Sequence, residues 1–311
     1  MDLFSRLFNE QIWFGELCLE LRNYKGERPY DEIILPRLEQ AQNTINSLEK
    51  YKLLNSPSNL YEVESEELWQ WYALGRLNDY LLMRFQLRED FYRATVHQSP
   101  EWQAWMKRVG HEHFLNWEGS VISEDQYIEF FDSLGFHSFT NQPYHPFYYE
   151  IVEAVETPQL SEEIRVDHVF WPGLMFGNMM FSRAGVRVLF RSCILEKAIA
   201  ENSRLYFTYW RFRRETADLS HGWGHNSQWR TNFRRDYETV AQYHFNVDGY
   251  RALGENHDYR AYLNEEEPDD LTMTERIELL VNRCFVSCRK KDIDRWPFDD
   301  RYDIAKNRKT G

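Results

Sequence analysis

Two histidines, His221 and His225, are the residues of this sequence best suited to acid–base chemistry, because the unperturbed pKa of imidazole lies near neutrality. Gly222 and Gly224 flank the tryptophan between them. Glycine lets a backbone approach a ligand closely and disfavours a helix, so we expect the pair to lie on a loop. Loops with varied polar side chains often form binding sites. The sequence therefore predicts general acid or base roles for His221 and His225.

Arginines and aromatic residues surround this loop in the chain. From Arg183 to Arg235 there are eleven basic and four acidic residues, so the segment carries +7 in a chain whose formal net charge is −13. A guanidinium offers a planar set of donors to phosphate or carboxylate, and aromatic faces stack on bases. We expect an anionic, phosphate-bearing small molecule or nucleotide to bind here. The predicted binding residues are Arg183, Arg187, Arg211, Arg213, Asn226, Gln228, Trp229, Arg230, Arg234 and Arg235. If a reaction follows binding, hydrolysis or transfer is the expected class, with the arginines stabilising developing negative charge.

A second pair, His145 and Glu150, lies just before a predicted strand. Residues at a strand entrance often face a cleft, so this pair could act with His221 or His225 as an acid–base pair. The alternative is a proline-rich turn whose tyrosines cover the core. The chain offers no partner that sequence alone can assign to His145, which favours the turn.

Metal binding is not expected at the histidine loop. The two histidines lack the helical spacing and the intervening glutamate of a metalloprotease motif, and zinc needs at least a third protein ligand. Spacing singles out none of the third-ligand candidates, which are His145, Asp167 and His168. A helix would place Cys284 and Cys288 on one face, but two such thiols do not make a zinc site. We therefore predict no metal and no cofactor, with zinc as the alternative.

The same charges permit a different function. The arginines could instead pair with carboxylates of the chain, since acidic residues outnumber basic ones, 50 to 37. The protein would then be an acidic interaction module, of the inhibitor or immunity type, that binds a basic partner protein without catalysis. Fast, salt-sensitive association is expected of such a module. The sequence leaves both functions open.

Composition excludes several classes. No apolar run approaches the roughly 20 residues of a membrane span, and the first residues do not resemble a signal peptide. Four scattered cysteines suit a reducing compartment, so a soluble cytoplasmic protein is expected. The net charge of −13 disfavours non-specific nucleic-acid binding. The glycines at 173, 177 and 185 match neither a Rossmann nor a P-loop spacing.

The elements that must position these residues follow from hydrophobic period. Apolar residues at helical spacing predict about five helices in region 1–135, among them helices at 31–48 and 68–87. Ser123 with Gln126, and Thr272 with Glu275, match capping boxes that open two helices, the second reaching about Lys290. Short segments rich in β-branched and aromatic residues predict strands at 147–156, 164–170, 185–191, 205–213 and 239–247. The prediction is an α+β fold: a helical region 1–135, a mostly antiparallel β region 136–255 with the candidate site and a helix at 193–202, and an acidic linker with a C-terminal helix at 256–311.

Overall fold

A computed structural model of the chain describes residues 13–53, 65–86, 104, 122–160, 163–191, 194–202, 235–249, 251–254, 271–288 and 300–306. Its helical elements are α2 (Trp13–Asn23), η1 (Tyr30–Ile34), α3 (Leu35–Leu38), α4 (Gln42–Leu48), η2 (Glu49–Tyr51), α5 (Ser65–Gln86), α7 (Glu124–Ser133), α8 (Lys197–Asn202) and α9 (Met273–Asn282). Its strands are β1 (His137–Phe139), β2 (Tyr149–Glu156), β3 (Ile164–Trp171), β4 (Gly173–Phe176), β5 (Met179–Ser182), β6 (Ala184–Phe190), β7 (Asp236–Glu238), β8 (Gln242–Phe245), β9 (Arg251–Ala252) and β10 (Asp300–Ala305). The predicted α+β class and the order of its parts are confirmed.

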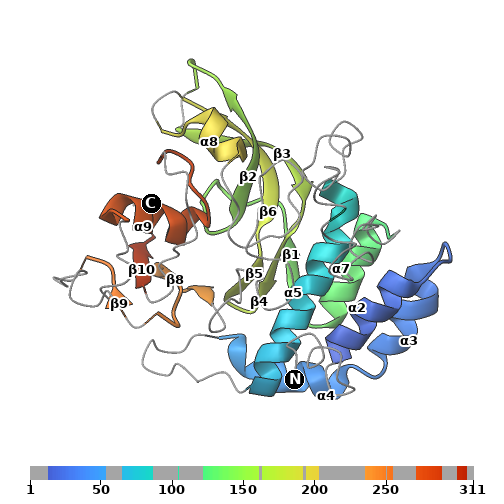
Figure 1. Cartoon of the computed structure of the whole chain (residues 1–311). Coiled ribbons are helices and arrows are strands. Elements are labelled where there is room, and N and C mark those ends of the chain that lie inside the picture. Colours follow the sequence, from blue (N-terminus) through green and yellow to red (C-terminus); the bar gives the residue numbers. More distant parts are fainter. Residues whose placement is uncertain are drawn as a thin grey trace.

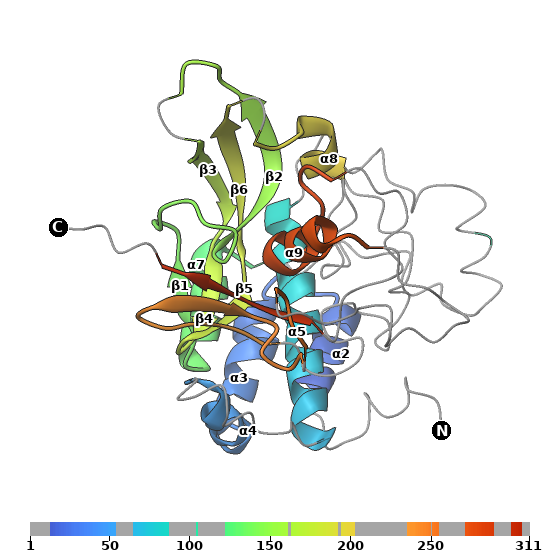
Figure 2. The same cartoon turned by 90° about the vertical axis from the view of Figure 1, so that its left-hand side faces the viewer.

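The described strands form two sheets. Seven strands follow the order β1-β4-β5-β7-β8-β10-β9, and three follow the order β2-β6-β3. Neighbouring strands are antiparallel except for β2 with β6 and β9 with β10. The strand pairing is therefore mostly antiparallel, as predicted. Figure 1 shows α2, α5 and α7 to one side of the strands and α9 to the other. In Figure 2 the three-stranded sheet stands above the seven-stranded one.

One bent pair of strands joins the two sheets. Pro172 alone separates β3 from β4, and Arg183 alone separates β5 from β6. Because β4 pairs with β5 and β3 with β6, the four strands form a single long hairpin. Its tip contains Gly177 at a φ of +59°, a backbone region that glycine adopts without strain. Arg183 therefore lies at the bend, where the two sheets meet.

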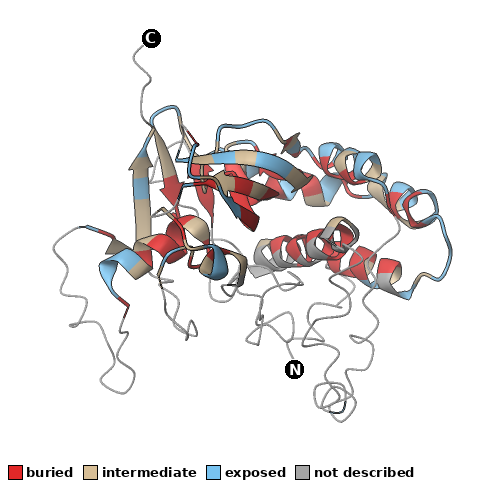
Figure 3. Ribbon diagram, turned by 90° about the horizontal axis from the view of Figure 1, so that it is seen from above, coloured by how far each residue is buried: buried red, intermediate tan, exposed pale blue. Residues whose placement is uncertain are grey.

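The N-terminal helices pack against one face of the seven-stranded sheet. Trp71 of α5 is fully buried, and its ring meets Tyr51, Phe136 and Phe176 edge to face. Phe176 and Tyr237, from β4 and β7, belong to the same core as the helices. Figure 3 shows buried residues along the inner faces of the helices and strands and exposed residues on the outer helices. The helical region and the sheet thus share one core.

The opposite face of the sheet contributes to a second core. Met175 and Met180 of the hairpin and Phe245 of β8 pack there with Val186 of β6 and Val281 of α9. This core lies between the seven-stranded sheet, the three-stranded sheet and the C-terminal helix. The two faces of β7 and β8 therefore pack against different cores, so successive side chains of these strands point toward different cores.

Several local predictions are confirmed, because they depend on neighbouring residues. Ser123 accepts the Gln126 N–H at 3.1 Å and the Gln126 side chain accepts the Ser123 N–H at 3.0 Å, which completes the first capping box. The second box, of Thr272 and Glu275, is also present. The strands predicted at 147–156, 164–170 and 185–191 match β2, β3 and β6.

Other boundaries are wrong. The C-terminal helix ends at Asn282, eight residues before the predicted end, because Arg283 adopts a left-handed conformation with a φ of 61°. Cys284 and Cys288 therefore do not share a helix face. The strand predicted at 239–247 is too long at both ends, because only Gln242–Phe245 forms β8 and residues 239–241 form the turn that follows β7. The segment 31–48 is interrupted between α3 and α4, and the short strands β1, β4, β5, β7, β9 and β10 were not predicted. The strand predicted at 205–213 lies outside the described residues.

Candidate functional site

The structure describes five of the predicted site residues: His145, Glu150, Arg183, Arg187 and Arg235. The other nine lie outside the described residues: Arg211, Arg213, His221, His225, Asn226, Gln228, Trp229, Arg230 and Arg234. Their roles stay predictions.

Arg183 is held inside the protein at the bend of the hairpin. Its side chain is 1% exposed. Nη1 donates to the carbonyl oxygen of Val281 at 2.9 Å, in the last turn of α9, and Nη2 lies 3.5 Å from Oδ2 of Asp236. A cation at a helix C-terminus is favoured by the negative end of the helix dipole. Arg183 thus fastens α9 to the sheet.

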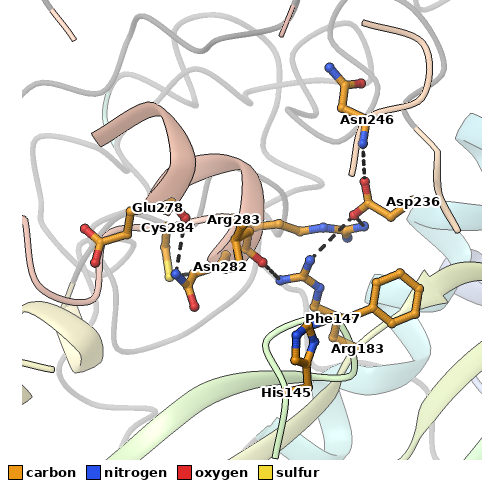
Figure 4. A network of polar contacts seen from close by, with 10 residues as sticks. His145, Phe147, Arg183, Asp236, Asn246, Glu278, Asn282, Arg283 and Cys284 are labelled. Carbon is orange, nitrogen blue, oxygen red and sulfur yellow. Dashed lines mark hydrogen bonds and ion pairs between the residues drawn. The ribbon is translucent and has the colours of Figure 1, made fainter. Parts of the chain in front are cut away.

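Asp236 is the centre of this network (Figure 4). The carboxylate is fully buried and lies on the face of β7 that is turned toward α9. Its Oδ2 also accepts from Nη2 of Arg283 at 2.7 Å, and its Oδ1 accepts the backbone N–H of Asn246 at 2.8 Å. Two guanidinium groups, from the hairpin and from the end of α9, therefore converge on one carboxylate. The bond to Arg283 also stabilises the left-handed residue that ends the helix.

Arg235 points to the other face of the sheet. Its Nη2 donates to Oδ1 of Asp248 at 2.7 Å, and its Nε lies 3.1 Å from the same oxygen. The guanidinium lies over the rings of Tyr51 and Tyr237, at 5.4 and 5.9 Å from their centroids. These tyrosines belong to the helix-side region, and the Tyr237 hydroxyl donates to the Tyr51 carbonyl oxygen at 2.7 Å. Arg235 therefore ties the sheet to the N-terminal helices.

Arg187 lies in the three-stranded sheet, on β6. Its Nε donates to Glu153 of β2 at 2.6 Å, and its Nη1 lies 3.6 Å from Asp167 of β3. The guanidinium also lies 5.7 Å from the centroid of the Phe170 ring. It bridges the two strands on either side of β6. Arg183, Arg187 and Arg235 thus contact three different sets of partners, and each set includes a carboxylate of the chain.

His145 lies close to Arg183 and is kept neutral. Its Nδ1 accepts the backbone N–H of Phe147 at 3.1 Å, and its ring stacks on Tyr243 with centroids 4.1 Å apart. Burial, followed by the charges of Arg183 and Lys306, lowers the pKa of His145 to about 4. An imidazole with this pKa is a weak base at neutral pH, since efficient acid–base catalysis needs a pKa near the operating pH.

Aromatic side chains cluster next to His145. The Tyr148 hydroxyl donates to the carboxylate of Glu238 at 2.5 Å, and the same carboxylate accepts from Lys306 at 2.6 Å. Burial, followed by the hydrogen bond to Glu238, raises the pKa of Tyr148. Glu150 is buried on β2, opposite Gly185 in the register. Its predicted acid–base pairing with His145 stays a prediction.

Sequence reasoning missed the carboxylates that receive the arginines. Asp236 and Asp248 follow Arg235 closely in the chain, but no local pattern shows which of them faces which core. A similar buried pair, Arg276 with Asp300, links α9 to β10. Within the described ranges, no three histidine, cysteine, aspartate or glutamate side chains gather as a metal would require. No helix in the same ranges is long and apolar enough to cross a membrane.

Comparisons with known proteins give no relative: no family model matches the chain, and neither a curated protein nor a solved structure is detectably similar to it.

Proposed function

We propose that the protein binds a basic partner protein through its negatively charged surface, and that the arginines described above stabilise the fold. One observation carries this proposal. Arg183, Arg187 and Arg235 each lie against a carboxylate of the same chain, at N–O distances of 3.5, 2.6 and 2.7 Å. The positive charge that suggested an anion site is thus matched internally at these three positions.

An anionic ligand would have to compete with the internal carboxylates. An anionic ligand that reached Arg183 or Arg235 would have to displace an internal carboxylate or share the guanidinium with it. Both side chains are almost fully buried, at 1% and 3% exposure, so displacement would leave a carboxylate desolvated without its cation. Removing one partner of a buried ion pair costs about 3–5 kcal/mol. These arginines are therefore better suited to structural roles than to ligand capture.

Helix α7 provides an acidic surface. Its inner face carries Tyr127, Phe130 and Phe131, which are buried. Its outer face carries exposed acidic residues, and the helix contains no basic residue; the acidic set is Glu124, Asp125, Glu129 and Asp132.

The charges of α7 are only partly explained by helix stability. Acids in the first turn are favoured by the helix dipole, but Asp132 in the last turn opposes it, at a cost of about 0.3–1 kcal/mol. Asp125 and Glu129 repel each other at a spacing of four residues. Basic side chains of a partner would relieve both effects, which supports binding at this surface.

The experiment uses two matched variants that remove the same number of negative charges. One replaces the acidic residues of α7 by their amides. The other does the same at exposed acidic positions elsewhere, namely Glu27, Glu39, Glu156 and Glu163. Proteins captured from the source cells are identified, purified and retested by titration calorimetry at low and high salt.

A basic partner with salt-sensitive affinity, lost in the α7 variant and kept in the control variant, supports the proposal. Capture of no basic protein, or equal loss of affinity in both variants, contradicts it. We also propose a cytoplasmic location, which the small number and irregular spacing of the four cysteines support, since disulfide-stabilised secreted proteins are usually richer in cysteine.

An anionic, phosphate-bearing ligand is a second candidate. It is favoured by two cations near His145, because burial lowers the pKa of His145 most and the charges of Arg183 and Lys306 lower it further. An anion bound nearby would raise that pKa. Titration of the His145 ring by NMR, with and without inorganic phosphate, tests the idea. Two results together would reject it. The pKa of His145 would stay unchanged at high phosphate concentration, and Arg230→Ala would have no effect on nucleotide binding.

A further inference from the structure

Three side chains on one face of the seven-stranded sheet, the face that also carries Tyr237, form a row of polar contacts. Nδ1 of His244 lies 2.9 Å from Oδ1 of Asp303, and Nε2 of His244 lies 3.4 Å from the hydroxyl oxygen of Thr239. His244 is on β8, Asp303 is directly opposite it on β10, and Thr239 lies in the turn between β7 and β8. Opposite residues of antiparallel strands share a face, so the sheet itself holds the imidazole against the carboxylate.

The hydrogen-bonding partners define the direction of the protons. A carboxylate can only accept, so Nδ1 of His244 donates to Asp303, and in the neutral imidazole the lone pair is on Nε2. That lone pair faces the Thr239 hydroxyl. Thr239 Oγ1 in turn accepts the Gln242 N–H at 3.1 Å. The Thr239 hydroxyl can also donate to the carbonyl oxygen of Gln242, which lies 3.2 Å from Oγ1. That carbonyl oxygen already accepts the Thr239 backbone N–H at 2.8 Å. The hydroxyl proton can therefore pass to the imidazole without leaving that carbonyl unsatisfied.

Thr239 is partly exposed, whereas His244 is buried. The side chain of His244 is 8% exposed, so the imidazole is fixed and largely desolvated. Val240, next to Thr239 at the hairpin tip, is 98% exposed. A substrate carried by another molecule could approach Thr239 from solvent. A nucleophile, a base within hydrogen-bonding reach and a carboxylate that orients the base form the arrangement used in covalent catalysis, and distances are often longer without substrate.

We propose that Thr239 is a nucleophile for acyl transfer from an ester or thioester. The hydroxyl oxygen forms a bond to the acyl carbon while its proton passes to Nε2 of His244. The bond between the acyl carbon and the leaving oxygen or sulfur then breaks, and His244 returns the proton to the leaving group. Water, activated by the same imidazole, hydrolyses the acyl-threonine and restores the hydroxyl. Thr239 and His244 are the catalytic residues, and Asp303 is a positioning residue. The inference does not rest on partner binding.

The experiment uses the full chain and p-nitrophenyl acetate as the acyl donor. Release of nitrophenolate is followed by absorbance, and the acetylated residue is located by mass spectrometry of peptides. Thr239→Val keeps the shape and removes the nucleophile, whereas Thr239→Ser keeps the hydroxyl. Acetylation of Thr140, which is also partly exposed, measures the background reaction of a threonine without this arrangement.

The expected result is an acetyl group on Thr239 and not on Thr140, lost in Thr239→Val and kept in Thr239→Ser. His244→Gln should slow acetylation by about 10²-fold or more, the usual contribution of a general base. Asp303→Asn should slow it and shift the pH profile of the rate, which a purely structural role would not do. Thermal unfolding of each variant reports folding, and the surface variants of Thr239 and Asp303 suffice if His244→Gln does not fold. Wild-type protein that neither carries acetyl-Thr239 nor releases nitrophenolate faster than Thr239→Val overturns the proposal. Acetylation of Thr239 that is unaffected by Asp303→Asn and His244→Gln also overturns it.

Discussion

Replacing Asp236 by asparagine tests whether Arg183 and Arg283 serve the fold. The change keeps the size of the side chain and removes the charge that both guanidinium groups share. The new amide would place N–H donors, or a neutral oxygen, where Nη2 of Arg283 donates at 2.7 Å and Nη2 of Arg183 lies at 3.5 Å. With the carboxylate fully buried and the arginines at 1% and 8% exposure, water cannot replace it readily.

The expected loss of stability is large. Breaking a buried ion pair by removing one partner costs about 3–5 kcal/mol. A whole domain is stable by about 5–15 kcal/mol, so Asp236→Asn should remove a substantial share. Urea unfolding at pH 7 measures the difference in the free energy of unfolding, and the slope of that free energy with urea concentration should be the same for both proteins. Asp31→Asn is the matched control, because Asp31 pairs with Arg28 at 2.9 Å while 40% exposed, and such surface pairs contribute about 0–1 kcal/mol.

Two outcomes would refute this reasoning. One is a loss at Asp236 no greater than that at Asp31. The other is a stable variant that has changed only in its affinity for phosphate. A further variant separates charge from packing: replacing all three charged side chains, Asp236, Arg183 and Arg283, by apolar residues should recover part of the stability, because apolar residues can substitute for a complete buried ion network.

Three further predictions concern single sites. Gly173→Ala should destabilise the protein by about 1–3 kcal/mol, because a Cβ there would lie 2.1 Å from the Phe139 ring; unchanged thermal unfolding would contradict this. Burial, followed by the bond to Glu278, raises the pKa of the Cys288 thiol to about 12. Alkylation of Cys288 at pH 9 should therefore be much slower than that of an unperturbed thiol and faster in Glu278→Gln, as followed by peptide mass spectrometry. The pKa of His145, about 4, lies below its unfolded value of about 6.5. His145 therefore contributes stability above pH 6.5 that is lost as the pH falls toward 4, so the stability difference between wild type and His145→Gln should shrink over that range in urea unfolding.

Some of this structure follows from short stretches of sequence. The capping boxes at Ser123 and Thr272 were predicted because each depends on hydrogen bonds between residues three positions apart. Val186, Arg187 and Val188 alternate between apolar and charged residues, which is typical of a strand with one buried face, and β6 has that pattern of burial. The α+β class followed from the order of these elements along the chain.

The partners of the charged residues were decided by the tertiary structure. Composition showed that positive charge is concentrated between Arg183 and Arg235, but Arg183 meets Asp236 and the end of α9 only because the hairpin bends there. The hydrogen bond between His244 and Asp303 likewise joins residues 59 positions apart, because β8 pairs with β10. A count of charges is a sum over the chain, whereas the energy of each charge depends on the distance to its partner and on the water excluded around it. Both quantities are set when the sheets and helices pack.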